Sequence, residues 1–134
     1  MGTVDKQRFV EIKVAVTTTG ANGSATGSAD TPSPVNGKLH AVYLDYHGSA
    51  PNTTDVTISQ KEGPTQTLLT VTDNATDGWK FPREQVHSNA GAGLTYDGSH
   101  AVAEAPPVTG KLTVSVAQSN ALTGCVTAWL YIET

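Results

Sequence analysis

The sequence predicts an all-β protein, a single domain built as an antiparallel β-sandwich or a jelly-roll-like fold. Several short stretches alternate apolar and polar residues, as half-buried strands do. Polar turn residues separate these stretches, and no stretch has the period of an amphipathic helix. The 134 residues match the length of one domain, 1–134. About seven short strands in a chain of this size favour two packed sheets.

The first predicted strand starts at Phe9, where apolar and polar residues alternate strictly. Its apolar face carries Val10, Ile12, Val14 and Val16. Residues 17–37 follow and are rich in Thr, Ser, Gly and Ala. They carry too little apolar surface to offset the entropy of ordering, so they are predicted to form a long flexible loop or arm. Such loops are often functional, and this one is a candidate for reaching a neighbouring subunit.

Residues 38–46 predict a second strand, central in its sheet because both faces are partly apolar. One face is expected to carry His40, Val42, Leu44 and Tyr46. Residues 54–60 and 66–72 are joined through Gly63-Pro64 and predict a hairpin. Leu69 and Val71 are expected to point inward in its second strand.

Residues 73–92 break the alternation with Asp-Gly, Phe-Pro and Gly-Ala-Gly. This composition predicts a long excursion that carries Trp79 and Phe81, with at most a short helical turn at 83–87. Residues 94–98 predict a short strand that runs into a turn.

Pro106-Pro107 suits neither a helix nor a central strand. Residues 111–117 and 125–132 then alternate again and predict the last two strands. In the final strand, Trp129 and Tyr131 lie opposite the aliphatic residues. Because these rings are costly to leave in water, a second sheet or another subunit is expected to cover them.

Composition disfavours several partners. Charged residues make up 15% of the chain and the formal net charge is −4, which repels nucleic acid. The single cysteine, Cys125, excludes an intramolecular disulfide and fits synthesis in a cytoplasm. No basic stretch followed by an apolar stretch is found after Met1, so neither a signal peptide nor a membrane span is expected.

The candidate chemical sites are weak. Residues 73–84 superficially follow a calcium loop, but Ala75 replaces one ligand and the residues also suit a tight turn. The four histidines, His40, His47, His87 and His100, lack metal-site spacing. Cys125 lacks the local signature of a nucleophile, and no hydrolase or phosphate-binding motif occurs. The sequence therefore predicts no enzyme activity, cofactor or metal.

One segment carries a family resemblance. Residues 71–88 read Val-Thr-Asp-Asn-Ala-Thr-Asp-Gly-Trp-Lys-Phe-Pro-Arg-Glu-Gln-Val-His-Ser. With Leu94-Thr-Tyr-Asp-Gly and Lys111-Leu-Thr-Val-Ser-Val-Ala-Gln, this segment resembles small β-rich virion proteins of tailed phages, some of which are capsid decoration or cement proteins. The resemblance extends from Val35 onward and consists of turn and strand residues rather than a catalytic signature.

The resemblance implies a non-enzymatic structural protein of a tailed bacteriophage, made in the host bacterial cytoplasm and located on the capsid surface of the virion. Its expected partners are the major capsid protein and other copies of itself, as a homotrimer that stabilises the head. The alternatives are a tail or baseplate protein and a carbohydrate-binding or adhesin module. Residue type alone suggests interface candidates, since Trp, Tyr and Arg are frequent in binding hot spots. These candidates are Trp79, Phe81, Arg83, Tyr96, Trp129 and Tyr131.

Overall fold

The computed structural model describes residues 8–134. The expectation about the chain start falls largely on residues 1–7, outside this range. The strands are β1 (Phe9–Val16), β2 (Ala25–Asp30), β3 (Val35–Tyr46), β4 (Asp55–Gln60), β5 (Thr67–Val71), β6 (Gly78–Lys80), β7 (Glu84–Gln85), β8 (Ala103–Glu104), β9 (Pro107–Gly110), β10 (Leu112–Ser119) and β11 (Val126–Glu133). Residues 8–134 form no helix, and thus none long and apolar enough to cross a membrane.

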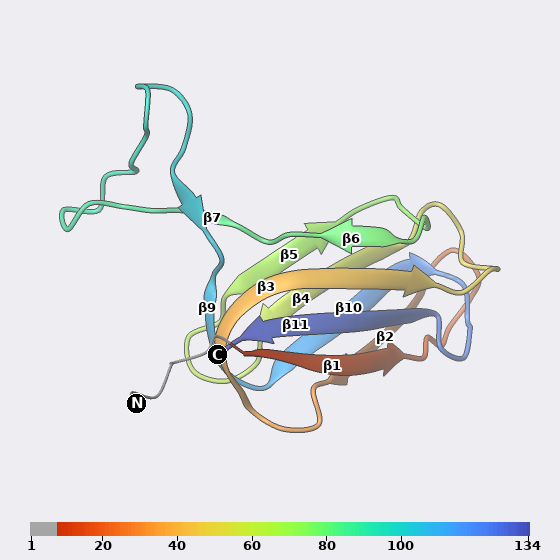
Figure 1. Ribbon diagram of the computed structural model, residues 1–134. Helices are drawn as coiled ribbons and strands as arrows, with labels where there is room; N and C mark the ends of the chain where they lie inside the picture. The colour runs from red at the N-terminus through yellow and green to blue at the C-terminus, as the bar shows by residue number, and fades with distance from the viewer. Residues whose placement is uncertain (1–7) are drawn as a thin grey trace.

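Two antiparallel sheets pack face to face (Figure 1). The first has the order β1-β11-β3-β6, and β9 pairs with the start of β3 on the same edge as β6. The second has the order β2-β10-β4-β5. The chain passes from one sheet to the other between most successive strands, which wraps the strand pairs around the barrel-like body as in a jelly roll. The predicted fold class is therefore confirmed.

The core lies between the two sheets and is almost entirely aliphatic. Its fully buried side chains alternate along the long strands, as in β11, where every second residue is buried. The largest of them are Leu39, Leu44, Ile58, Leu112, Leu130 and Ile132. The strands predicted at 9–16, 54–60, 111–117 and 125–132 are confirmed, and so is the hairpin of β4 and β5. Leu69 and Val71 pack against the core.

The prediction of a flexible segment over residues 17–37 is wrong. Residues 25–30 form β2, which pairs with β10 at the edge of the second sheet, and Val35 already belongs to β3. The segment is ordered by backbone pairing and close packing rather than by large side chains. A Cβ at Gly27 would lie 2.2 Å from the carbonyl oxygen of Thr17, so the absence of a side chain lets the two segments pass in contact.

The expected faces of β3 are wrong at its centre. Tyr131 of β11 pairs with Ala41 and Ile132 pairs with Leu39, so His40 is an extra residue in a β-bulge. The bulge turns Leu39 into the core, where it is fully buried, and places His40 on the outer face. The alternation rule fails here because one inserted residue reverses the faces of all residues before it.

Two local predictions in the long excursion are also wrong. No helical turn forms at 83–87, and residues 94–98 make a single bridge, Thr95 to Ala101, in place of a strand. Instead, residues 84–104 extend away from the sandwich as a protrusion (Figure 1). The paired strands β7 and β8 form its base. Which segment leaves the body depends on β6 and β9, the strands of the first sheet between which the protrusion lies.

Candidate functional site

The large aromatic residues gather on the outer face of the first sheet. Both phenylalanines and both tryptophans of the chain lie there, together with two of the four tyrosines. We call this set the aromatic surface; it consists of Phe9, Tyr43, Trp79, Phe81, Trp129 and Tyr131. Tyr46 is the aromatic residue of the core, so the protein places its largest apolar side chains outside rather than inside.

Strand register brings these residues together. Trp129 of β11 lies opposite Tyr43 of β3, and Tyr43 lies opposite Trp79 of β6. The rings of Tyr43 and Trp79 meet edge to face with centroids 5.1 Å apart. Lys13, opposite Trp129 on β1, extends this row with its amine 5.1 Å from the indole centroid. The row therefore crosses four strands of the sheet, β1, β11, β3 and β6.

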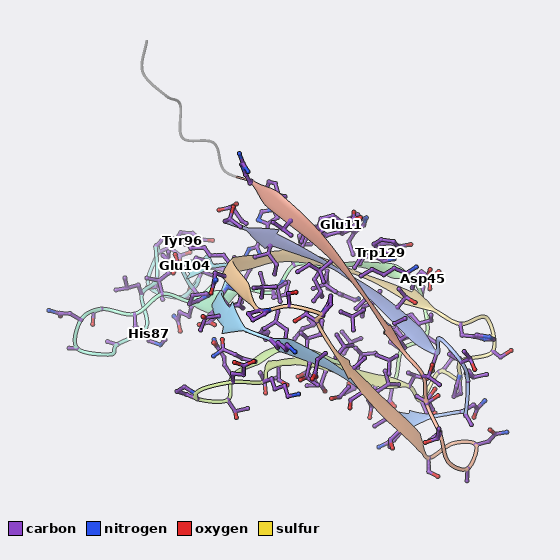
Figure 2. All side chains as sticks on the ribbon, turned by 90° about the horizontal axis from the view of Figure 1, so that it is seen from below. Glu11, Asp45, His87, Tyr96, Glu104 and Trp129 are labelled. Carbon is purple, nitrogen blue, oxygen red and sulfur yellow. The ribbon has the colours of Figure 1, made fainter. Side chains whose placement is uncertain are left out.

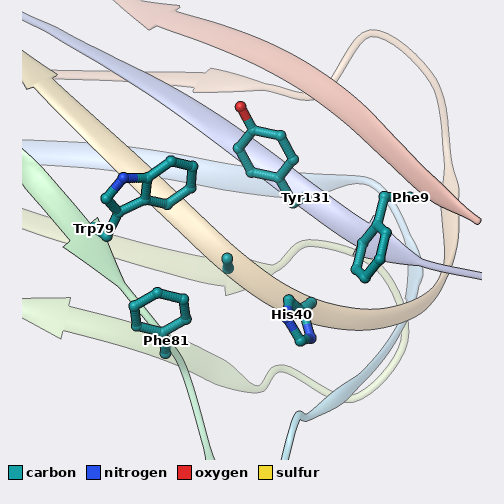
Figure 3. A pocket seen from close by; sticks show the side chains of 6 residues that line it. Phe9, His40, Trp79, Phe81 and Tyr131 are labelled. Atoms are coloured by element: carbon teal, nitrogen blue, oxygen red, sulfur yellow. The ribbon is translucent and has the colours of Figure 1, made fainter.

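Trp79 is the centre of the aromatic surface. Its ring centroid lies 5.4 Å from that of Tyr131 and 6.3 Å from that of Phe81, the latter nearly parallel. Phe9 closes the other side, with its ring 5.0 Å from that of His40. Figure 3 shows this arrangement around a shallow hollow. The hollow has a volume of about 330 Å³ and is lined by Phe9, His40, Ala41, Trp79, Phe81 and Tyr131.

A second hollow shares two walls with the first. It has a volume of about 370 Å³ and is lined by Glu11, Tyr43, Trp79, Trp129 and Tyr131. The hydroxyl of Tyr131 donates a hydrogen bond to Oε2 of Glu11 at 2.7 Å. This bond, with the adjacent carboxylate charge, raises the pKa of Tyr131 above its ordinary value. Figure 2 shows Glu11 and Trp129 standing out from the same face, with Asp45 at its far end.

The aromatic surface is open to solvent. Phe9 is 54% exposed, Trp79 51% and Phe81 58%. Because an aromatic side chain can bury about 150–250 Å², these three leave roughly 300 Å² of apolar area in water. This area is at the lower end of the largest apolar patches found on monomeric proteins, about 300–600 Å², and such patches are often functional.

The structure brings four of the six predicted interface candidates together, namely Trp79, Phe81, Trp129 and Tyr131. Arg83 lies beside them but is engaged within the chain, because its guanidinium donates to the carbonyl oxygen of His40 at 2.9 Å. Tyr96 lies apart on the protrusion, 72% exposed and stacked on His100. Figure 2 shows Tyr96 on the protrusion, away from Trp129.

Sequence reasoning missed four residues of this site: Phe9, Glu11, Lys13 and Tyr43. The alternation did place Glu11, Lys13 and Tyr43 on the faces opposite their aliphatic neighbours. What it lacked was the pairing of β1, β11, β3 and β6, since only that register puts these residues next to Trp79.

The acidic loop after β5 has a structural role. Asp77 accepts a hydrogen bond from the backbone N–H of Tyr46 at 2.7 Å, and Asn74 accepts one from Thr76 at 2.6 Å. Asp73 adopts a left-handed conformation, with φ 51°, which suits a turn. Among residues 8–134, no three His, Cys, Asp or Glu side chains come together as a group that could hold a metal.

Two other candidates lack the geometry of catalysis. Cys125 is fully buried, and its Sγ lies 3.2 Å from Oγ of Ser119, which in turn contacts Oγ1 of Thr54. At the tip of the protrusion, Asp97 and Ser99 both approach Nδ1 of His100. A nucleophile and its orienting carboxylate must use different ring nitrogens, so this exposed group has no proton relay.

Asp97 instead builds the turn at the tip. Its Oδ1 accepts hydrogen bonds from the backbone N–H groups of His100 at 2.6 Å and Ser99 at 3.0 Å. These backbone bonds, with that to the His100 side chain, lower the pKa of Asp97. Tyr96 is held over His100 by the same turn, with ring centroids 5.6 Å apart.

Similarity to known proteins adds no assignment. No family model, curated protein or solved structure matches this chain. Function is therefore inferred from the fold, the aromatic surface and the protrusion.

Proposed function

We propose that this protein is a non-enzymatic structural protein of a tailed bacteriophage, a decoration or cement protein that binds the outer capsid surface and stabilises the head. Its partners are the major capsid protein and further copies of itself in a homotrimer. The observation that carries the proposal is the aromatic surface, where both Trp and both Phe of the chain lie outside the core.

Exposed tryptophan and phenylalanine are costly for an isolated domain. Their burial in the core would stabilise the fold, yet Trp79 and Phe81 remain more than half exposed. Large rigid rings on a sheet face give much contact area at a low entropy cost, which is why they dominate binding hot spots. The placement favours a protein whose work is to contact other proteins.

The fold supports the same proposal by analogy. Jelly rolls recur in viral capsid proteins and in lectins, although a fold alone does not imply a function. The resemblance to phage virion proteins runs through residues 71–88, which include the whole of β6. The strand that supplies Trp79 therefore belongs to the part of the chain that carries the resemblance.

A decoration protein gains firm attachment from number. Each copy makes a modest contact with the shell, and a trimer at a three-fold position makes several at once. The effective local concentration of the second and third contacts then multiplies the affinity without any new kind of interaction. Shell subunits linked in this way separate less readily on heating.

The test is binding to expanded capsids that lack this protein. We expect saturation at a fixed stoichiometry that matches the capsid symmetry, and a higher temperature of capsid disruption. Localisation by averaged electron microscopy of the intact particle should find the protein on the head. Capsids that neither bind it nor gain heat resistance contradict the proposal, and density on the tail or baseplate assigns it there instead.

One observation favours a second candidate, a carbohydrate-binding module. The hydrogen-bonded Glu11 and Tyr131 lie in the hollow walled by Trp79 and Trp129. Sugars bind where polar groups stand beside aromatic faces. A glycan array should then show binding that Trp79→Ala abolishes and Tyr131→Phe weakens roughly tenfold, since that variant keeps the ring and loses the hydroxyl. A protein that binds no glycan but binds capsids rejects this candidate.

A further inference from the structure

The protrusion, residues 84–104, is ordered by its own backbone but has no core. Val86 donates to the carbonyl of Val102, Val102 donates to Leu94, and Leu94 donates to Val86, with N to O distances of 2.7–3.0 Å. These bonds join its two turns into one unit. Every residue from 89 to 104 is nevertheless exposed. Ordering about 20 residues costs conformational entropy that no buried side chains offset, so we expect another surface to cover this segment.

The exposed side chains of the protrusion are partly apolar. Tyr96 is 72% exposed, Leu94 40% and Val102 36%. Given typical areas for such side chains, they leave roughly 200–300 Å² in water. This area is close to that left by Phe9, Trp79 and Phe81 on the aromatic surface. Each copy thus carries two uncovered apolar areas of similar size, one projecting and one hollowed.

The two areas are neighbours at one end of the sandwich. Only Pro82 and Arg83 separate Phe81 from the start of the protrusion. Arg83 fixes this corner through its hydrogen bond to the His40 carbonyl, and Lys38 reaches Glu104 at 3.8 Å from the other side of the base. Figure 1 shows the protrusion extending outward from this end, away from the two sheets of the sandwich.

We propose that the protrusion of one copy packs on the aromatic surface of a second copy. Leu94, Tyr96 and Val102 enter the hollow that Phe9, Trp79 and Phe81 form on the neighbour. The contact is heterologous, and the proposed assembly repeats it around a rotation axis near the shared corner to close a ring rather than an open filament. This inference rests on the proposed function, because it names another copy as the partner of the aromatic surface.

Stoichiometry and size favour a second copy over a foreign protein. In a closed ring, each copy gives one protrusion and receives one, so both uncovered areas of every chain are buried together. A foreign partner seated on either area leaves the other in water. A protrusion of about 20 residues is at the lower end of the roughly 20–30 residues per side of a stable interface, and each copy in a ring makes two such contacts.

Engineered disulfides test the contact directly. Tyr96→Cys and Phe81→Cys chains carrying different tags are coexpressed and oxidised in the absence of capsids. In three-membered rings assembled at random from equal amounts of the two chains, one junction of each mixed ring brings the two cysteines together, so we expect a mixed disulfide in about half of the chains. Pairing Tyr96→Cys with Ser24→Cys, an exposed position in the β1–β2 turn, should give none. The native Cys125 is buried and does not compete.

The unmodified chain supplies a second readout. Light scattering should find a closed oligomer for the natural sequence and a monomer when residues 86–102 are replaced by Asn-Gly. The inference is overturned by a monomeric natural chain or by the absence of the mixed disulfide. It is also overturned if a chain that carries both Tyr96→Cys and Phe81→Cys forms the disulfide within itself. If the natural chain forms oligomers through this contact but does not bind capsids, only the proposed function fails. If the natural chain binds capsids but does not form this contact, only the inference fails.

Discussion

Tyr131 donates its hydroxyl proton to Oε2 of Glu11 at 2.7 Å, between directly paired residues of β11 and β1. The bond sits beside Trp79, in the wall that separates the two hollows. It ties the edge strand β1 to the aromatic surface and gives that surface its one polar pair in the second hollow. Because both residues are at the solvent face, the bond can be examined without disturbing the core.

The first prediction concerns this bond. Replacement Glu11→Gln removes the carboxylate charge, so we expect the raised pKa of Tyr131 to fall back toward about 10, the ordinary value for tyrosine. Ultraviolet absorbance of tyrosinate, followed through an alkaline titration, measures the change. Tyr131→Phe should remove the same titration step. Identical titration curves for the natural chain and Glu11→Gln would show that the bond is not formed in solution.

The second prediction concerns the buried hydroxyl of Tyr46, which has no hydrogen-bond partner in the described residues. Burial, with the charge of Asp77, raises its pKa to about 12, against about 10 in an unfolded chain. The folded state then holds the proton more tightly. Stability is fully present below pH 10 and is lost as pH rises from about 10 to 12, by roughly 2–3 kcal/mol from this group.

We expect Tyr46→Phe to remove that alkaline loss and to leave stability at neutral pH unchanged or slightly higher, since an unpaired buried hydroxyl is eliminated. Denaturant unfolding at several pH values measures both effects. Tyr96→Phe, at an exposed position, is the control and should leave the pH dependence unchanged. A cost above about 1 kcal/mol for Tyr46→Phe at neutral pH would instead reveal a partner for the hydroxyl.

The third prediction tests the order of β2. Gly27→Ala places a Cβ 2.2 Å from the Thr17 carbonyl oxygen, so we expect destabilisation of at least about 2 kcal/mol. Gly48→Ala is the matched control, because its Cβ meets nothing within 4 Å. Its effect should be within about 1 kcal/mol. Equal stabilities of the two variants in chemical denaturation would mean that residues 17–30 do not pack as described.

The fourth prediction tests the bulge in β3. Leu39 is fully buried whereas His40 lies at the outer face, so we expect Leu39→Ala to cost about 2–5 kcal/mol. His40→Ala removes a half-buried side chain and should cost about 1 kcal/mol or less. Uninterrupted alternation through 38–46 predicts the reverse order. Thermal denaturation of the two variants therefore decides between the two registers.

The fifth prediction concerns the protrusion. No residue from 86 to 102 belongs to the hydrophobic core. Replacement of 86–102 by Asn-Gly, which joins the paired residues Gln85 and Ala103, should therefore leave the unfolding free energy of the single domain within about 1 kcal/mol. Unfolding is measured at low protein concentration, where association does not contribute. A much less stable variant would assign the protrusion a role in holding the sandwich.

The sequence by itself determined the class of fold and most of the long strands. Alternation is a local property, and the burial of every second residue in β11 follows directly from its period of two. The same alternation indicated that Trp129 and Tyr131 face away from the core. Local turn chemistry likewise located the hairpin of β4 and β5.

Only the tertiary structure decided which distant segments meet. Residues 25–30, which carry only small or polar side chains, form a strand because β10 offers a pairing edge and Gly27 passes against Thr17. The bulge at His40 arises from the pairing of β3 with β11, and the aromatic surface exists because β6, β3 and β11 align Trp79 with Tyr43, Trp129 and Tyr131. Register between segments far apart in the chain depends on close packing across the whole sandwich, and no local pattern of side chains contains that information.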